Sequence, residues 1–253
     1  MAISNNKLTS RPRYWKDFLL GSLAVLSFIC LFFIEPISQD LKYHLFADTR
    51  TILGINNFFD VASNVPFFFA GLLGLFAIYN KWGVTSSWSW LTLFLSVLLV
   101  AFGSSYYHLN PQNETLTWDR IPMAIGFMAL FVIVLTDYVN SQLEKWLLIP
   151  MCIIGVTSVV YWHLTDDLRI YAWVQFVSLA LLLIIIVIYK PTHLQTRYLA
   201  YAVVFYTLSK ICEYFDKQIY ELMGQIMSGH TIKHLLAAIA TYFFYILLKR
   251  RVN

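Results

Sequence analysis

The sequence predicts an all-α membrane protein: a polytopic membrane helical bundle with a seven-helix core and one extra N-terminal transmembrane helix. The first observation is composition, since 59% of the 253 residues are hydrophobic and 13% charged, with a mean hydropathy of +0.64. Soluble domains carry about 25% charged residues. The second is that apolar residues gather in eight runs of about 17–25 residues, the length that crosses a bilayer as a helix. A soluble core of this size could not enclose so much apolar surface.

The first run covers residues 17–34 and follows several basic residues, as the apolar part of a signal peptide would. No small-residue cleavage site follows, because the run ends in Glu35-Pro36. We therefore interpret it as a retained transmembrane helix. The polar segment 35–57 is expected to form a structured cap on the outer side. Helix and cap together make the predicted N-terminal unit, residues 1–56.

The remaining runs make the predicted seven-helix domain, residues 57–253. Proline occurs inside or at the ends of several runs, which membrane helices tolerate better than soluble ones. We find no internal repeat and no soluble domain. The seven runs cover residues 58–80, 88–108, 120–137, 145–163, 170–189, 198–215 and 231–248.

Basic residues orient the bundle. With a cytoplasmic N-terminus, eleven of them lie on the cytoplasmic side: Lys7, Arg11, Arg13, Lys16, Lys81, Lys145, Lys190, Arg197, Lys249, Arg250 and Arg251. Six lie on the opposite side: Lys42, Arg50, Arg120, Arg169, Lys217 and Lys233. Because cytoplasmic loops carry the excess of Lys and Arg, we expect both termini in the cytoplasm. The opposite face is then periplasmic, extracellular or lumenal.

This topology gathers polar residues from distant parts of the chain at one membrane face. The run 88–108 travels outward and ends at His108, and the next begins near Asp119. The last run begins on the same side, at His230 and His234. Four polar residues therefore reach similar depth in the same leaflet.

The spacing of these residues fits a catalytic metal. His230 and His234 are four residues apart, so they share one helix face. With His108 they supply three imidazoles, a known arrangement for catalytic zinc with one open position. The HTIKH motif lacks the glutamate that the HExxH motif of zinc proteases supplies, so Asp119 is the candidate general base. Ser104, one turn before His108, is a candidate oxyanion donor.

Each residue also has a simpler interpretation. An interfacial histidine is often an amphipathic anchor. Asp119 at the start of a helix can cap it, and Ser104 can bond back to its own helix. Spacing and topology alone leave the metal site and these alternatives open.

A second polar group lies in the run 198–215. Charged groups inside a membrane helix are costly and indicate function by default. Lys210 and Glu213 are three residues apart and can form a structural ion pair. Alternatively, Lys210, Tyr206 or Tyr214 contacts a substrate headgroup or positions an acidic partner. Lys233 lies on a different face from the two histidines beside it, and we expect it to snorkel to the interface.

The pattern Ser104-x3-His108, Asp119 in WDRIPM, and His230-x3-His234 resembles the alkaline ceramidase family. That family belongs to a superfamily of seven-helix membrane hydrolases that also includes the adiponectin receptors. The resemblance covers residues 57 to 248, so the first run would be an extra helix.

The resemblance implies one catalytic Zn²⁺ held by the three histidines, with Asp119 handling the water and Ser104 assisting the metal or the oxyanion. It implies a hydrolase of linear amide C–N bonds, which releases a fatty acid and a long-chain base from ceramide in sphingolipid metabolism. The lipid would enter from the bilayer. We expect no nucleic acid and no protein partner.

The segment FFDVASNVPF is similar to the first core helix of the family. We expect Asp60, Ser63 and Asn64 beside the zinc site or in a polar packing seam, with Tyr107 near the substrate or behind the ligands. Eukaryotic relatives bind Ca²⁺ through an acidic cluster before this helix. Here only Asp48 and Asp60 lie in that region, which speaks against a calcium site.

The alternative function is a seven-helix receptor or sensor with structural zinc and no hydrolysis. Against it, the chain has no long extramembrane region to bind a protein ligand. A weaker alternative is an ion carrier that uses Lys210 and Glu213. Which N-acyl lipid is the substrate is left open by the sequence.

Overall fold

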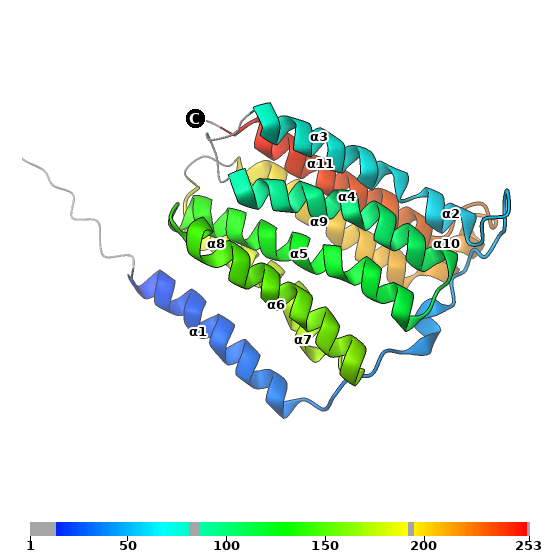
Figure 1. Ribbon diagram of the computed structural model, residues 1–253, viewed down its shortest axis with the longest axis horizontal. Coiled ribbons are helices and arrows are strands. Elements are labelled where there is room, and N and C mark those ends of the chain that lie inside the picture. The colour runs from blue at the N-terminus through cyan, green and yellow to red at the C-terminus, as the bar shows by residue number, and fades with distance from the viewer. Residues whose placement is uncertain (1–13, 81–86, 192–194, 252–253) are drawn as a thin grey trace, which may run out of the picture.

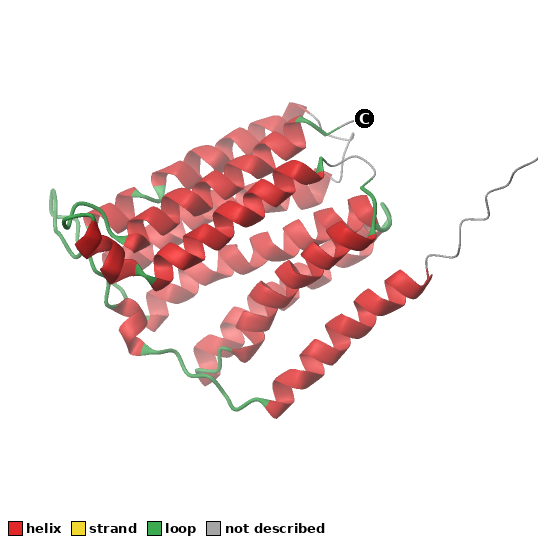
Figure 2. Ribbon diagram, turned by 180° about the vertical axis from the view of Figure 1, so that it is seen from behind, coloured by secondary structure: helices red, strands yellow, loops and turns green. Residues whose placement is uncertain are grey.

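The computed structural model describes residues 14–80, 87–191 and 195–251, and within these ranges it contains helices and loops but no strand (Figure 2). The predicted fold class is confirmed. The elements are α1 (Tyr14–Cys30), η1 (Leu31–Phe33), η2 (Leu41–His44), α2 (Phe58–Ala62), α3 (Val65–Asn80), α4 (Ser87–Leu109), α5 (Asn113–Tyr138), α6 (Leu143–Thr165), α7 (Arg169–Ala172), η3 (Trp173–Val177), α8 (Ser178–Ile188), α9 (Thr196–Tyr214), α10 (Asp216–Leu222) and α11 (Gly229–Lys249).

Seven helical stretches of the described residues are long and apolar enough to cross a membrane. They are Tyr14–Phe33, Phe58–Asn80, Trp88–Leu109, Asn113–Tyr138, Leu143–Thr165, Arg169–Ile188 and Gly229–Lys249. The eighth predicted run forms α9, which is less apolar because its 19 residues include Arg197, Lys210 and Glu213. Since α9 packs along α11, it completes the seven-helix core.

Helix α5 is the centre of the bundle. It packs against α4, α6 and α8, and more of its apolar window is buried than in the other candidate spans. On the other side of the bundle α11 packs between α9 and α3 (Figure 1). The core formed by these contacts is made of side chains such as Trp90, Phe94, Ile133, Leu182 and Leu247. The apolar runs therefore bury one face each and leave the other for lipid.

The start of α5 corrects one expectation. The helix begins at Asn113, six residues before Asp119, because Gln112 and Thr115 form a capping box. The Gln112 side chain accepts from the third helical backbone N–H, and the Thr115 side chain accepts from the backbone N–H of Gln112. Asp119 consequently lies in the second turn and does not cap the helix.

Two predicted spans are interrupted. The span 58–80 is divided at Ser63 and Asn64 into α2 and α3. The span 170–189 contains a π-helical turn, η3, between α7 and α8. Such turns are rare and are found at functional sites. Both interruptions bring polar side chains toward the interior of the bundle.

Helix α1 lies at the edge of the bundle (Figure 1). It is held at its two ends by hydrogen bonds from Trp173 Nε1 to Ser27 Oγ, 3.1 Å, and from the Tyr189 hydroxyl to Asp17. The segment after it crosses the bundle as the cap, joined to the α6–α7 loop by Leu168 N to Ile37 O, 2.9 Å. The domain boundary at 56/57 stays a prediction.

Helix α1 begins and α11 ends at the same side of the bundle (Figure 1). This arrangement agrees with an even number of crossings. The face on which the termini lie stays a prediction. Four of the basic residues that support it, Lys7, Arg11, Arg13 and Lys81, lie outside the described residues.

Candidate metal centre and lipid cavity

Three histidines from two helices meet at the cap side of the bundle. His108 comes from the last turn of α4, and His230 and His234 come from the first turns of α11. Each pair of ring centroids is 4.9 Å apart, and one nitrogen of each ring lies within 4.8 Å of the others. The side chains are buried, with at most 3% exposed. The predicted topology placed these three histidines at the same end of the bundle, and the structure agrees.

The chemistry of the triangle fits a metal ion. Neither ring nitrogen of His108 has a hydrogen-bond partner among the described residues, although both are buried. Buried polar atoms are rarely left unpaired. Three imidazoles at this spacing are a donor set that zinc uses in catalytic sites. This buried group could therefore hold a metal ion.

Ser63 forms a hydrogen bond with the ring of His234. Its hydroxyl donates to the backbone carbonyl of Asp60 at 3.0 Å and lies 2.7 Å from Nδ1 of His234. When the hydroxyl proton goes to the Asp60 carbonyl, the serine oxygen accepts from Nδ1–H of His234, since a hydroxyl has one proton. The Nε2 atom of His234 is then unprotonated, as a metal ligand requires. The break between α2 and α3 is what positions Ser63 here.

Asp60 and Asn64 form hydrogen bonds next to the start of α11, the helix that carries His230 and His234. Asp60 Oδ1 accepts from the Thr231 hydroxyl at 2.7 Å, and Ser228 caps α11 by accepting from Thr231 N at 3.0 Å. Asn64 Nδ2 donates to the Asp60 carbonyl at 2.8 Å. These bonds anchor the start of α11 to α2, and they hold the two α11 histidines against His108.

Ser104 and Asp119 face each other between α4 and α5. The Ser104 side chain lies beside the Asp119 carboxylate. Both residues are buried, and both line the same cavity as His234. The helices can approach closely here because Gly103 has no side chain: a Cβ atom at this position would lie 2.2 Å from the Trp118 carbonyl oxygen.

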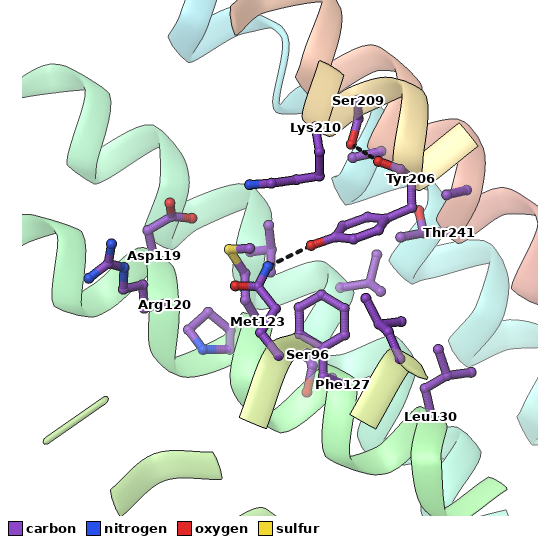
Figure 3. Close-up of a pocket in the computed structure, with 18 of the residues that line it drawn as sticks. Ser96, Asp119, Arg120, Met123, Phe127, Leu130, Tyr206, Ser209, Lys210 and Thr241 are labelled. Atoms are coloured by element: carbon purple, nitrogen blue, oxygen red, sulfur yellow. Dashed lines mark hydrogen bonds between the residues drawn. The ribbon is translucent and has the colours of Figure 1, made fainter. Parts of the chain in front are cut away.

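A cavity of about 310 Å³ extends from this polar group into the bundle. Its cap end is lined by Ser104, Asp119 and His234. Its deeper part is mainly apolar, with walls contributed by α4, α5, α8, α9 and α11 (Figure 3). Apolar lining residues include Leu130, Leu182, Leu199, Val203 and Phe244. A polar head above a hydrocarbon-lined space suits a lipid with a reactive group at one end.

Comparison with known proteins now decides the family. A family model described as ceramidase matches residues 50–251. The chain belongs to the ceramidase family. Membership makes it a hydrolase that acts on the N-acyl amide bond of ceramide, so its substrate is a lipid. The predicted resemblance is confirmed over all seven core helices, and the match begins within the cap segment. The comparison with curated proteins returned no match.

An ionic network lies beside the histidines of this ceramidase-family site. Glu213 pairs with Lys210 and accepts from Lys233 Nζ at 2.7 Å. The Tyr43 hydroxyl of the cap donates to the same carboxylate at 3.0 Å. Burial raises the pKa of Tyr43 well above its ordinary value, so the hydroxyl remains a donor. The predicted Lys210–Glu213 pair is present, and both residues line the cavity.

Lys233 corrects an expectation. It does not snorkel to the interface, because its side chain is 15% exposed, pairs with Glu213 and lines the cavity. Its ammonium lies 3.2 Å from Nε2 of His230. The sequence carries no signal for this position, since Glu213 is 20 residues away and belongs to another helix.

The cap covers the histidines. The Phe46 ring lies 4.7 Å from His108 and 4.6 Å from His230, centroid to centroid. The Tyr107 hydroxyl lies 2.8 Å from Nδ1 of His44 in the cap, and Tyr107 is not a residue of the cavity wall. Asp216 ties the cap to α11 by accepting from Ala47 N at 2.9 Å and from His230 N at 2.7 Å.

Arg120 is a second site residue that the sequence did not single out. Its guanidinium lies 4.0 Å from the centroid of Trp162 and 4.8 Å from that of Tyr171, and it donates to Gln39 of the cap at 2.7 Å. Such stacking stabilises a buried cation. Because Arg120 lines the cavity next to Asp119, it adds positive charge at the polar end.

Proposed function

We propose that this protein is a zinc-dependent amidohydrolase that cleaves the N-acyl amide of ceramide-like lipids within the membrane. The observation that carries the proposal is the buried triangle of His108, His230 and His234 beside Asp119, at the polar end of an apolar cavity. Family membership supports the reaction, and the donor set supports zinc.

In this proposal the three histidines hold one zinc ion. Zinc in a site of this kind supplies Lewis-acid activation of a carbonyl and of water. The bond between Ser63 and His234 keeps the imidazole in the tautomer that a ligand needs. Phe46 packs on two of the three rings and excludes bulk water from them.

Asp119 is the proposed general base. It takes a proton from the attacking water while the water oxygen bonds to the amide carbon. The C–N bond then breaks, and the proton passes from Asp119 to the leaving nitrogen, giving a fatty acid and a long-chain base. Each proton is accounted for without another acid.

Ser104 is proposed to position Asp119. Its hydroxyl lines the cavity beside that carboxylate, where it can donate to Asp119 or to an oxyanion that develops on the amide carbonyl. Lys233, an ammonium of the cavity wall, supplies positive charge beside the histidines. Glu213 holds that ammonium in place.

The lipid is proposed to enter from the bilayer with hydrocarbon in the deep part of the cavity. Its amide then reaches the polar end, beneath the cap. We further propose that both termini are cytoplasmic and that the metal centre lies near the opposite face. The excess of basic residues around the termini supports this orientation.

The test is metal analysis of the purified protein together with fatty-acid release from ceramide. The variant is His230→Ala with His234→Ala. The matched control is His163→Ala, which removes an exposed histidine whose Nδ1 lies 3.0 Å from the Thr117 hydroxyl. We expect about one zinc per chain in the wild type and the control, and loss of metal and release in the double variant.

Other results separate the alternatives. Zinc without release of fatty acid from any N-acyl lipid would favour the receptor or sensor with structural zinc. Release that persists in the metal-free double variant would refute the metal mechanism. No zinc in folded wild-type protein supplied with zinc would also refute it.

A further inference from the structure

A polar pair lies in the apolar part of the cavity, away from the metal centre. Gln175 Nε2 donates to the Tyr206 hydroxyl at 2.5 Å, which joins the π-helical turn η3 to α9. Figure 3 shows this bond at Tyr206, beside Phe127. Tyr206 is four residues before Lys210, so it lies deeper in the membrane by about 6 Å along the helix axis.

The neighbouring hydroxyls differ from this pair. Ser209 donates to the Tyr206 carbonyl at 2.6 Å, and Thr241 donates to the Ala238 carbonyl at 2.8 Å. Each is satisfied within its own helix, as serine and threonine commonly are in membranes. Gln175 and Tyr206 instead extend from two different helices into the cavity wall.

The pair has hydrogen-bonding capacity left over. As placed, the Tyr206 O–H remains a donor and the Gln175 Oε1 an acceptor, and the described residues offer neither atom a further partner. With the amide turned over, the tyrosine donates to Oε1, and the Gln175 NH₂ and the tyrosine lone pair remain. Either orientation leaves at least one donor and at least one acceptor.

We propose that Gln175 and Tyr206 bind a hydroxyl group on a hydrocarbon chain of the lipid substrate. A hydroxyl both donates and accepts, so it can satisfy both remaining atoms. In the apolar part of the cavity no bulk water competes, and an unmatched polar atom is costly. The π-turn is the local irregularity that places Gln175 opposite α9. This inference rests on the proposed function, because it places the lipid chain in this cavity.

The test measures equilibrium binding and hydrolysis with the full chain in lipid nanodiscs. Three ceramides of equal chain length serve as probes: one without a chain hydroxyl, one with a hydroxyl added to the acyl chain and one with it added to the base chain. Binding is read by displacement of a fluorescent ceramide, which needs no turnover. The variants are Tyr206→Phe and Gln175→Leu, with Thr241→Val as control.

We expect one hydroxylated ceramide to bind about tenfold better than the plain one in the wild type. Both site variants should lose that preference, so that the ratio of the affinities for the hydroxylated and the plain ceramide falls to about one. Thr241→Val should retain the preference, because its hydroxyl is already bonded to Ala238.

Equal binding of all three ceramides by the wild type would overturn the proposal. So would an equal change for all three ceramides in the variants, which would make the pair a latch between η3 and α9. Failure of the proposed function looks different: the lipids bind with the expected preference, and no fatty acid is released from any of them.

Discussion

Gly103 is the position at which a single methyl group tests the proposed site most directly. It lies on α4 next to Ser104, where the backbone of α5 approaches closely. We predict that Gly103→Ala lowers fatty-acid release strongly while the chain still folds. The reason is geometric, because the substitution separates the two helices that bring Ser104 and Asp119 together.

The magnitude follows from the distances. The added Cβ would lie 2.2 Å from the Trp118 carbonyl oxygen, whereas real Cβ atoms essentially never come within 3.0 Å of a non-bonded heavy atom. The backbone must therefore shift by at least about 0.8 Å, the difference of those two distances. Overpacking of this kind costs about 1–3 kcal/mol, offset by about 1 kcal/mol of helix propensity. A displacement of about 1 Å in a catalytic constellation can cost about 100-fold in rate.

The assay compares kcat for fatty-acid release with the melting temperature and metal content of the same preparation. Gly21→Ala is the control, since a Cβ there meets nothing within 4 Å and α1 lies outside the proposed site. We expect a large loss of kcat at nearly constant metal content in Gly103→Ala alone. A kcat within about threefold of wild type would refute the reasoning.

Three further perturbations test individual contacts. Ser63→Ala removes the acceptor for His234 Nδ1–H and should weaken metal affinity about 10- to 100-fold in a chelator competition, with Ser63→Thr restoring it. Asp216→Ala removes the acceptor shared by the cap and α11 and should lower the free energy of unfolding by about 1.5–3 kcal/mol, read as a lower melting temperature. Asp40→Ala is the control, because the hydrogen bond that Asp40 accepts from Lys42 N is exposed. Hydrogen bonds from Arg169 hold the pKa of Asp167 below its usual range. This pair therefore stabilises the fold fully above about pH 4 and less as the pH falls further. Asp167→Asn should weaken the loss of stability at acid pH, read from the melting temperature as a function of pH.

Each of these three predictions has an outcome that contradicts it. Unchanged metal affinity in Ser63→Ala would mean that another group fixes the imidazole of His234. An equal loss of stability in the Asp216 and Asp40 variants would mean that the shared acceptor is not special. If Asp167→Asn loses stability at acid pH as steeply as the wild type does, the pH dependence comes from other carboxylates.

The candidate site divides into a part that the sequence predicts and a part that it does not. His230 and His234 share a helix turn, and the span count places His108 and Asp119 at the same face. These relations are local or topological, and the structure has the four residues at one end of the bundle. Their catalytic and metal-binding roles stay predictions.

The start of α5 shows where local interpretation failed. Hydropathy placed the helix start near Asp119, whereas hydrogen bonds between Gln112 and Thr115 begin it six residues earlier. The residues that cap the helix are polar, so they are not counted in the apolar run. The helix therefore begins earlier than hydropathy predicts. The interruption at η3 was missed for a related reason, because a π-turn needs no change in composition.

The sequence by itself determined the helical membrane class and the positions of the apolar runs, because hydrophobic length and helical periodicity are set by residues close together in the chain. It also singled out the three histidines that the structure brings together. Only the tertiary structure decided which groups surround them. Tyr43 meets Glu213 across 170 residues, and Phe46 meets His108 and His230 from the cap. Lys233 faces the cavity because α9 supplies its partner. Such contacts depend on how helices pack and where a loop crosses them, and they cannot be predicted from residues that are close together in the sequence.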